Sequence, residues 1–181
     1  MKPVFKTITC VAVIVSVLMS NSILALAYDD NAPLIQKLKE AKHTLLEGIS
    51  QAEVSQGTAI SAKFELEDGK LLLSVYTAKE GLKKDSESNP LIESNGEATN
   101  NQWTPGVEVF TDREHVGRAS KHLTLMQLSK YTLKEIIAEA SEYHDGTVFR
   151  VDPNIREGKP VADVLISTPK GDTTLVSVPL N

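Results

Sequence analysis

The amino-acid sequence predicts an α+β protein made of two repeats, each an amphipathic helix packed on a small antiparallel β-sheet. Two observations carry this prediction. Apolar residues recur at helical spacing in two separate stretches, and each stretch precedes runs in which apolar and polar residues alternate. The segments ELEDGKLLLSV (65–75) and STPKGDTTLVSV (167–178) then place similar turn signals between the runs of each half. Helical periodicity followed by hairpin strands is typical of α+β domains.

The first residues have the composition of a secretory signal peptide, which is removed from the mature protein. Lys2 and Lys6 supply a positive n-region, and an apolar h-region covers residues 8–19. This apolar stretch is shorter than the roughly 20 residues that a membrane-spanning helix needs. We therefore expect residues 1–27 to be cleaved, with no stable membrane anchor afterwards; an uncleaved anchor is the alternative. The expected cleavage site comprises Ala25, Ala27 and Tyr28.

Composition narrows the classes of partner. Apolar residues make up 41% of the chain and charged residues 24%, which fits a globular protein. Cleavage removes Cys10, the single cysteine, so the mature chain has no thiol, disulfide or cysteine metal site. The formal net charge is −5, and it becomes more negative without the basic n-region. We expect a periplasmic or secreted protein that does not bind nucleic acid.

The first repeat is predicted to begin with one amphipathic helix over residues 33–54. Residues 60–67 then alternate between apolar and polar side chains, as in a strand with one covered face. Asp68-Gly69 predicts a type I′ hairpin turn, because that turn needs positive φ at both central residues. The return strand covers residues 70–78. The apolar positions of the helix are Leu34, Leu38, Ala41, Leu45, Ile49 and Ala52.

A polar segment interrupts this pattern. Residues 83–106 are rich in Ser, Asn, Gly and Pro with little periodicity, so we predict a long loop inserted into the first repeat. Loops of this length tend to be functional or disordered. Residues 107–111 (VEVFT) predict the third strand of the first repeat, which spans residues 28–118. A turn and a further strand near Val116 are expected to follow.

The second repeat, residues 119–181, begins with a helical pattern over residues 123–143. Within it, Thr132 and Glu135 have the spacing of a capping box, which predicts a helix start. Gly146 follows the helical pattern, and strand-like runs come after it. The predicted strands are residues 147–152, 160–167 and 173–180.

Residues 129–181 resemble a PepSY domain, a family with a short amphipathic helix followed by a small antiparallel sheet. The helix Leu133–Ala140 and the G-x-V-x-x-V start of the first strand at Gly146–Val151 carry the resemblance. It extends to residues 33–82 and 105–112. PepSY domains occur in propeptides of thermolysin-type metalloproteases and in standalone bacterial envelope proteins. The resemblance implies binding or inhibition of a protease, or restraint of activity at the cell surface, and it does not imply catalysis.

No catalytic, cofactor or metal site is predicted. The chain has no G-x-S-x-G motif and no glycine-rich phosphate-binding motif. Glu40 and His43 have the E-x-x-H spacing of di-iron bundles, but those sites need two such motifs. His115 and His122 could converge across a turn, without a third ligand in view. The histidines are His43, His115, His122 and His144.

Aromatic residues supply the candidate binding site. Trp103, the single tryptophan, lies in the polar insertion. We expect it either to fold back over the edge of the sheet or to act as a contact anchor, a frequent role of tryptophan at interfaces. Tyr76 and Phe110 would extend such a contact patch.

The sequence thus predicts a non-catalytic module that binds a protein or peptide through open sheet faces or edges. A protease is the partner that the resemblance implies. A small-ligand-binding envelope protein, with a pocket between helix and sheet, is the first alternative. Self-association through exposed sheet edges is the second.

Overall fold

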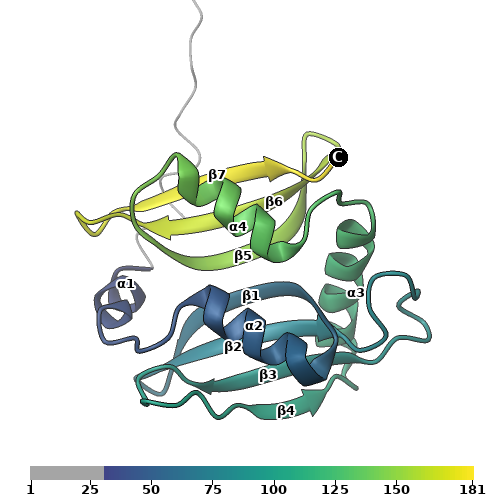
Figure 1. Ribbon diagram of the computed structural model, residues 1–181, viewed down its shortest axis with the longest axis horizontal. Helices are drawn as coiled ribbons and strands as arrows, with labels where there is room; N and C mark the ends of the chain where they lie inside the picture. Colours follow the sequence, from purple (N-terminus) through teal and green to yellow (C-terminus); the bar gives the residue numbers. More distant parts are fainter. Residues whose placement is uncertain (1–30) are drawn as a thin grey trace, which may run out of the picture.

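A seven-stranded antiparallel sheet with four helices forms the fold, as the computed structural model shows for residues 31–181 (Figure 1). The predicted signal peptide and its cleavage site lie outside the described residues. The helices are α1 (Ala32–Leu38), α2 (Leu45–Gln56), α3 (Arg113–Gln127) and α4 (Leu133–Glu142). The strands are β1 (Thr58–Glu67), β2 (Lys70–Ala78), β3 (Leu91–Glu97), β4 (Gly106–Val109), β5 (Thr147–Arg156), β6 (Lys159–Ser167) and β7 (Thr173–Pro179). The α+β class predicted from the sequence is confirmed.

The strands follow the order β4-β3-β2-β1-β5-β6-β7 in one continuous sheet. The strands of the two predicted repeats join where β1 pairs with β5, through Ala62 opposite Val151 and Lys63 opposite Arg150. The division of the chain into repeats at residue 118 stays a prediction. In the structure this point lies inside α3, which contacts both β1 and β5.

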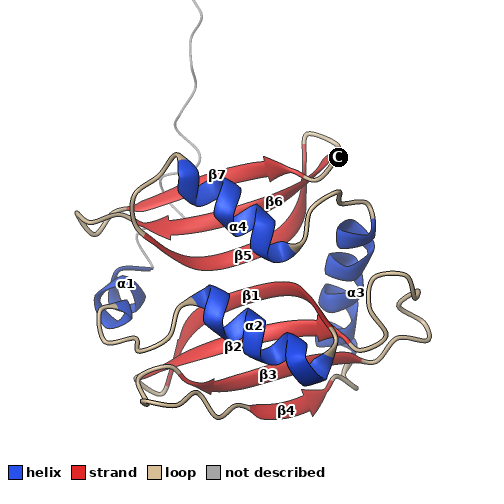
Figure 2. Cartoon of the chain, viewed as in Figure 1, coloured by secondary structure: helices blue, strands red, loops and turns tan. Residues whose placement is uncertain are grey.

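Helices α2 and α4 lie side by side over one face of the sheet (Figure 2), where the Lys134–Glu53 ion pair of 2.7 Å joins them. The hydrophobic core lies between these helices and the sheet. A Cβ placed on Gly48 of α2 would come within 2.5 Å of Leu73 on β2, so helix and strand are in close contact. Fully buried side chains include Ile49, Leu73, Ile136, Phe149 and Ile166.

The single helix predicted over residues 33–54 is wrong, because the chain forms α1 and α2 with a break between them. Thr44 has extended dihedral angles, φ −87° and ψ 162°, and its Oγ1 accepts a hydrogen bond from the backbone N–H of Glu47 at 3.2 Å. Glu47 in turn accepts from the backbone N–H of Thr44 at 2.7 Å. This capping box starts a new helix inside a continuous apolar pattern.

The hairpin at Asp68-Gly69 is confirmed, with φ of 49° and 77° at the two residues. Positive φ at both central positions is the geometry of a type I′ turn, which joins β1 to β2. The turn between β5 and β6 has the same form, with φ of 51° at Glu157 and 75° at Gly158.

The long loop predicted over residues 83–106 is wrong, because this segment contains β3. Leu91 and Ile92 begin the strand, which pairs with β2 along its whole length and carries β4 on its outer edge. The strand predicted over residues 107–111 is confirmed as β4, with slightly earlier bounds. The predicted insertion therefore adds a strand to the sheet.

The strand expected near Val116 is also wrong, because this residue lies in α3. The helix predicted over residues 123–143 consists of the end of α3 and the whole of α4. The capping box of Thr132 and Glu135 is confirmed at the start of α4. The three strands predicted after it are confirmed as β5, β6 and β7. No helix among residues 31–181 is long and apolar enough to cross a membrane.

Candidate functional site

The face of the sheet opposite α2 carries polar side chains. Successive side chains of a strand point to opposite faces. Along β1, Ala62 and Phe64 enter the core, so Ser61, Lys63 and Glu65 point to the opposite face. Helix α3 covers one end of this polar face, where the Nδ1 atom of His122 lies 2.9 Å from Oγ of Ser61.

A pocket lies between α3 and the polar face. Its floor comes from three strands, and α3 forms its roof. The strands contribute Ser61, Lys63, Tyr76, Arg150 and Asp152. The volume of the pocket is about 20 Å³, which is room for roughly one water molecule. The pocket can therefore take one small polar group of a ligand, and the rest of any ligand would have to extend onto the open sheet face.

Helix α3 presents one face to this pocket. His115, Arg118, Ala119 and His122 line it, and they are spaced three, four and seven residues from the first, which is the repeat of a helix face. Asp112 caps the helix by accepting hydrogen bonds from the backbone N–H groups of Glu114 and His115. The helical spacing of these four residues could have revealed the cluster in the sequence. It was missed because a turn and a strand were expected there instead of a helix.

Three aromatic rings form a stack at the entrance of the pocket. The ring of Phe110 lies 5.7 Å from that of Tyr76 and 5.2 Å from that of His115, with interplanar angles of 27° and 15°. The Oδ2 atom of Asp112 lies 2.7 Å from Nδ1 of His115 and fixes the orientation of this ring. The structure thus brings together Tyr76 and Phe110, two of the three residues predicted to form a contact patch.

Trp103 lies apart from this stack, in the core. Its side chain is 2% exposed, and its Nε1–H donates to the backbone O of Gly96 at 3.2 Å. Gln51 of α2 donates to the backbone O of Trp103 at 2.8 Å. Trp103 therefore folds back over β3, the packing role that was the first expectation. In this position its ring is not available as an exposed contact anchor.

The hydroxyl of Tyr76 stays protonated across the physiological range. Burial raises the pKa of Tyr76, and the negative charges of Glu93 and Glu65 raise it further. The Nζ atom of Lys63 lies 5.8 Å from the centroid of the tyrosine ring, within the range of a cation–π contact. Tyr76 thus offers a neutral hydroxyl and a ring face to the pocket.

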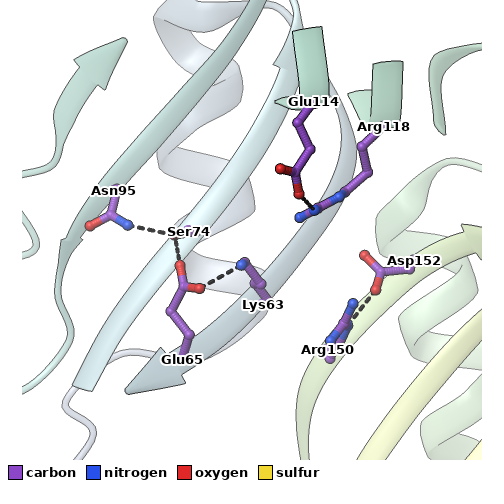
Figure 3. Close-up of polar contacts among 8 residues, drawn as sticks. All are labelled: Lys63, Glu65, Ser74, Asn95, Glu114, Arg118, Arg150 and Asp152. Carbon is purple, nitrogen blue, oxygen red and sulfur yellow. Dashed lines mark hydrogen bonds and ion pairs between the residues drawn. The ribbon is translucent and has the colours of Figure 1, made fainter. Parts of the chain in front are cut away.

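Three cationic side chains from three elements line the pocket, and each pairs with a carboxylate of its own element (Figure 3). Lys63 pairs with Glu65 on β1, and Arg150 pairs with Asp152 on β5. On α3, the Nη2 atom of Arg118 lies 2.8 Å from Oε1 of Glu114, four residues earlier. Sequence reasoning missed these cations, because the elements that bring them together are distant along the chain.

A hydrogen-bond network holds the Lys63–Glu65 pair in place (Figure 3). Asn95 of β3 donates from Nδ2 to Oγ of Ser74 at 2.7 Å, and Ser74 donates to Oε1 of Glu65 at 2.8 Å. Glu65 receives Lys63 through its other oxygen, Oε2. The network therefore crosses β1, β2 and β3 and fixes the position of Lys63.

His122 is the buried titratable group of the pocket. It is 7% exposed, and burial lowers its pKa, against the opposing effect of the Asp152 carboxylate. The positive charges of Lys121, Arg150 and Arg118 lower the pKa further. His122 is thus held neutral near pH 7, with its Nδ1 atom directed at Ser61.

The histidines do not assemble into a metal centre in the described part of the chain. No group of three His, Cys, Asp or Glu side chains among residues 31–181 is placed to hold a metal ion. His43 lies outside the helices, with Nε2 2.9 Å from the backbone O of Asn100. His144 is exposed after the end of α4.

Two wider hollows lie elsewhere on the surface. One of about 280 Å³ lies between α4 and β7 and includes Tyr131, Glu135 and Glu139. Another of about 200 Å³ lies beside α1 and includes Ile35 and Leu38. Neither gathers side chains of one charge from three elements, as the pocket under α3 does.

Comparisons with known proteins are sparse. No protein-family model matches the chain, and no curated protein matches it. Among solved structures, a candidate lipoprotein from Clostridium difficile 630 matches with 13% sequence identity and a TM-score of 0.39. This match covers 78% of the present chain and 88% of the other. At this level of similarity it carries no argument about function.

Proposed function

We propose that the chain is a secreted or periplasmic, non-catalytic module that binds a peptide segment of a partner protein. In this proposal the segment lies on the polar face of the sheet and directs one side chain into the pocket under α3. The observation that carries the proposal is the small volume of the pocket, about 20 Å³, beside an open sheet face. Sites for small molecules are typically several hundred Å³, whereas a peptide needs only a pocket for an anchoring side chain.

The aromatic stack supports a protein partner. Tyr76 and His115 flank Phe110 at the pocket, and aromatic side chains are enriched at binding hot spots. Phe110 is 9% exposed, so the stack is largely rigid before binding, which limits the entropy lost on association. The two PepSY-like repeats and a protease as the partner are the parts of the proposal that rest on the sequence resemblance.

A small ligand is the second candidate, because polar groups converge in the same pocket. Ser61, Tyr76 and His122 place two hydroxyls and a ring nitrogen around it. A few placed polar groups are the usual means by which a small-molecule site fixes the orientation of its ligand. This candidate predicts that a compound raises the melting temperature, since binding to the folded state alone stabilises it.

The test is a pull-down with the mature chain, residues 28–181, against envelope and culture-supernatant proteins. Tyr76→Ala removes the half-buried ring at the pocket, and His115→Ala removes an exposed ring of the same stack. Tyr143→Ala is the matched control, because this tyrosine is 72% exposed and does not line the pocket. Circular dichroism checks that each variant folds.

The expected result is a protein that the wild type and the Tyr143 variant retain and that both pocket variants lose. Addition of the wild type to that protein, if it is a protease, then tests for inhibition. Equal retention by all variants, or no retention above an unrelated protein of similar charge, would sink the proposal. A compound that stabilises the wild type while no protein is retained would favour the small-ligand candidate.

A further inference from the structure

We infer that the pocket under α3 recognises a carboxylate, so that the partner segment is acidic at its anchoring position. This inference rests on the proposed function and adds the chemistry of the ligand. The whole chain has a net charge of −5, which by itself favours a basic partner. The lining of the pocket differs from this balance, because it includes Lys63, Arg118 and Arg150 but only one carboxylate, that of Asp152, while Glu65 and Glu114, which pair with Lys63 and Arg118, lie outside the lining.

The ion pairs of the pocket leave donors for a ligand. Arg118 contacts Glu114 through Nη2, and Arg150 contacts Asp152 through Nε. A guanidinium has five N–H donors in a planar fork. Among the contacts within residues 31–181, Nη1 and Nε of Arg118 and both Nη atoms of Arg150 therefore have donors to spare.

The ion pairs of the pocket are all local to one element. Lys63–Glu65, Arg118–Glu114 and Arg150–Asp152 each lie within one element, so these pairs do not join α3 to the sheet. In Figure 3 the cationic groups of Lys63, Arg118 and Arg150 are each directed at a carboxylate of their own element, and all three side chains line the one pocket. Each cation is partly neutralised by its own carboxylate, and an anion bound in the pocket would add interactions with cations of more than one element.

Lys63 and helix α3 are held in place before any ligand binds. Glu65 is fixed by Ser74 and Asn95, which in turn places Lys63, whose side chain is only 19% exposed. Lys121 of α3 donates to Oδ1 of Asn154 on β5 at 3.0 Å and holds the helix over the sheet. Pre-organised donors strengthen binding because less conformational entropy is lost.

A carboxylate fits both the size and the donors of the pocket. A pocket of about 20 Å³ admits one oxygen of a carboxylate, and the planar fork of an arginine matches the two oxygens of a carboxylate. The hydroxyl of Tyr76, which is hydrogen-bonded to Glu93, is neutral and adds no negative charge to the pocket lining. The carboxylate can belong to an Asp or Glu side chain or to the free C-terminus of the partner.

The experiment is a selection from random dodecapeptides displayed with free carboxyl termini, using the mature chain, residues 28–181. The test variant is Arg118→Glu combined with Arg150→Glu, both at half-exposed side chains. The matched control is Arg113→Glu combined with Lys170→Glu, which changes the net charge equally at exposed positions outside the pocket. Selected peptides are then synthesised, and their affinities are measured by fluorescence anisotropy.

The expected result is enrichment of Asp, Glu or a free C-terminus at one position, with the wild type and the control variant but not with the test variant. Replacement of the selected Glu by Gln should weaken binding about tenfold or more, because a charge-assisted hydrogen bond is lost. Amidation of the peptide should weaken binding equally if the C-terminus supplies the carboxylate. These two arms identify the source of the carboxylate.

Two results would overturn the inference and are distinguishable from a failure of the proposed function. Enriched peptides without an acidic position, or peptides that bind the test variant as tightly as the wild type, would refute carboxylate recognition while peptide binding stands. A wild type that enriches no peptide at all would refute the proposed function together with the inference. Circular dichroism of the test variant excludes unfolding as the cause of lost binding.

Discussion

Replacement of Trp103 by alanine tests whether this residue is part of the core or a contact anchor. The indole ring is 2% exposed and packs on Gly96, where an added Cβ would lie 2.9 Å from Nε1 of the ring. Its Nε1–H donates to the backbone O of the same glycine at 3.2 Å. The Trp103→Ala variant therefore empties a packed position over β3 and removes one hydrogen bond.

The size of the effect follows from this burial. A buried aromatic ring removes about 150–250 Å² from water, which at about 25 cal/mol per Å² corresponds to about 4–6 kcal/mol as an upper bound. Truncations of buried Phe or Trp to alanine cost about 3–5 kcal/mol. We expect a loss of about 3–5 kcal/mol, a large part of the roughly 5–15 kcal/mol that stabilises a typical domain.

Urea unfolding followed by far-ultraviolet circular dichroism measures this loss. Fluorescence cannot serve, because Trp103 is the single tryptophan and the variant has no such signal. Tyr143→Ala is the control at an exposed aromatic residue, 72% accessible, and its effect should stay within about 0.5 kcal/mol. The dependence of the free energy on urea should remain unchanged in both variants.

A loss of less than about 1 kcal/mol in the free energy of unfolding of Trp103→Ala would refute the packing argument, because truncation of a tryptophan buried to this extent should cost more than that. Such a result, together with weaker retention of a partner protein, would restore the contact-anchor hypothesis for this residue. Trp103→Phe keeps a ring in the same place and should lose less stability than the alanine variant.

Three further predictions concern charge and capping. Burial lowers the pKa of His122 below its unfolded value of about 6.5. The unfolded state therefore binds a proton first as pH falls, so the free energy of unfolding should decrease from about pH 6.5 downward. Unfolding curves measured between pH 7.5 and 5 should show a smaller change with pH for His122→Gln than for the wild type, and an equal change would contradict the assignment. Asp163→Asn should cost about 1–3 kcal/mol in urea unfolding at pH 7, since this carboxylate accepts hydrogen bonds from Asn154, Arg156 and Ser177; a neutral outcome would mean that the network contributes nothing. Thr44→Ala should cost about 1 kcal/mol through loss of the α2 cap, and the absence of any change would show that the break after α1 does not depend on this cap.

Local chemistry explains which elements could be predicted. The Asp68-Gly69 hairpin requires two residues that tolerate positive φ, and the sequence shows them directly. The start of α4 follows from the reciprocal hydrogen bonds of Thr132 and Glu135, which are three residues apart. The same pattern occurs at Thr44 and Glu47, where the continuous apolar stripe concealed it.

The two elements that the sequence analysis assigned wrongly, β3 and α3, lack a clear hydrophobic pattern because of the neighbours they pack against in the tertiary structure. Strand β3 continues beyond Leu91 and Ile92 with polar residues, because its inner face packs small side chains and Gly96 beneath Trp103. Helix α3 lies on the polar face of the sheet, so its pocket-lining side carries His115, Arg118 and His122 in place of a leucine stripe. Burial of this kind depends on a neighbour that is distant in the sequence.

The sequence by itself determined the α+β class, the Asp68-Gly69 hairpin turn and most of the strands, because turn geometry, capping and side-chain alternation act over a few residues. Only the tertiary structure decided that β1 pairs with β5 and that α3 crosses the polar face. These two long-range contacts bring Lys63, Arg118 and Arg150 to one pocket. No spacing along the chain encodes their proximity, because it results from the packing of three separate elements.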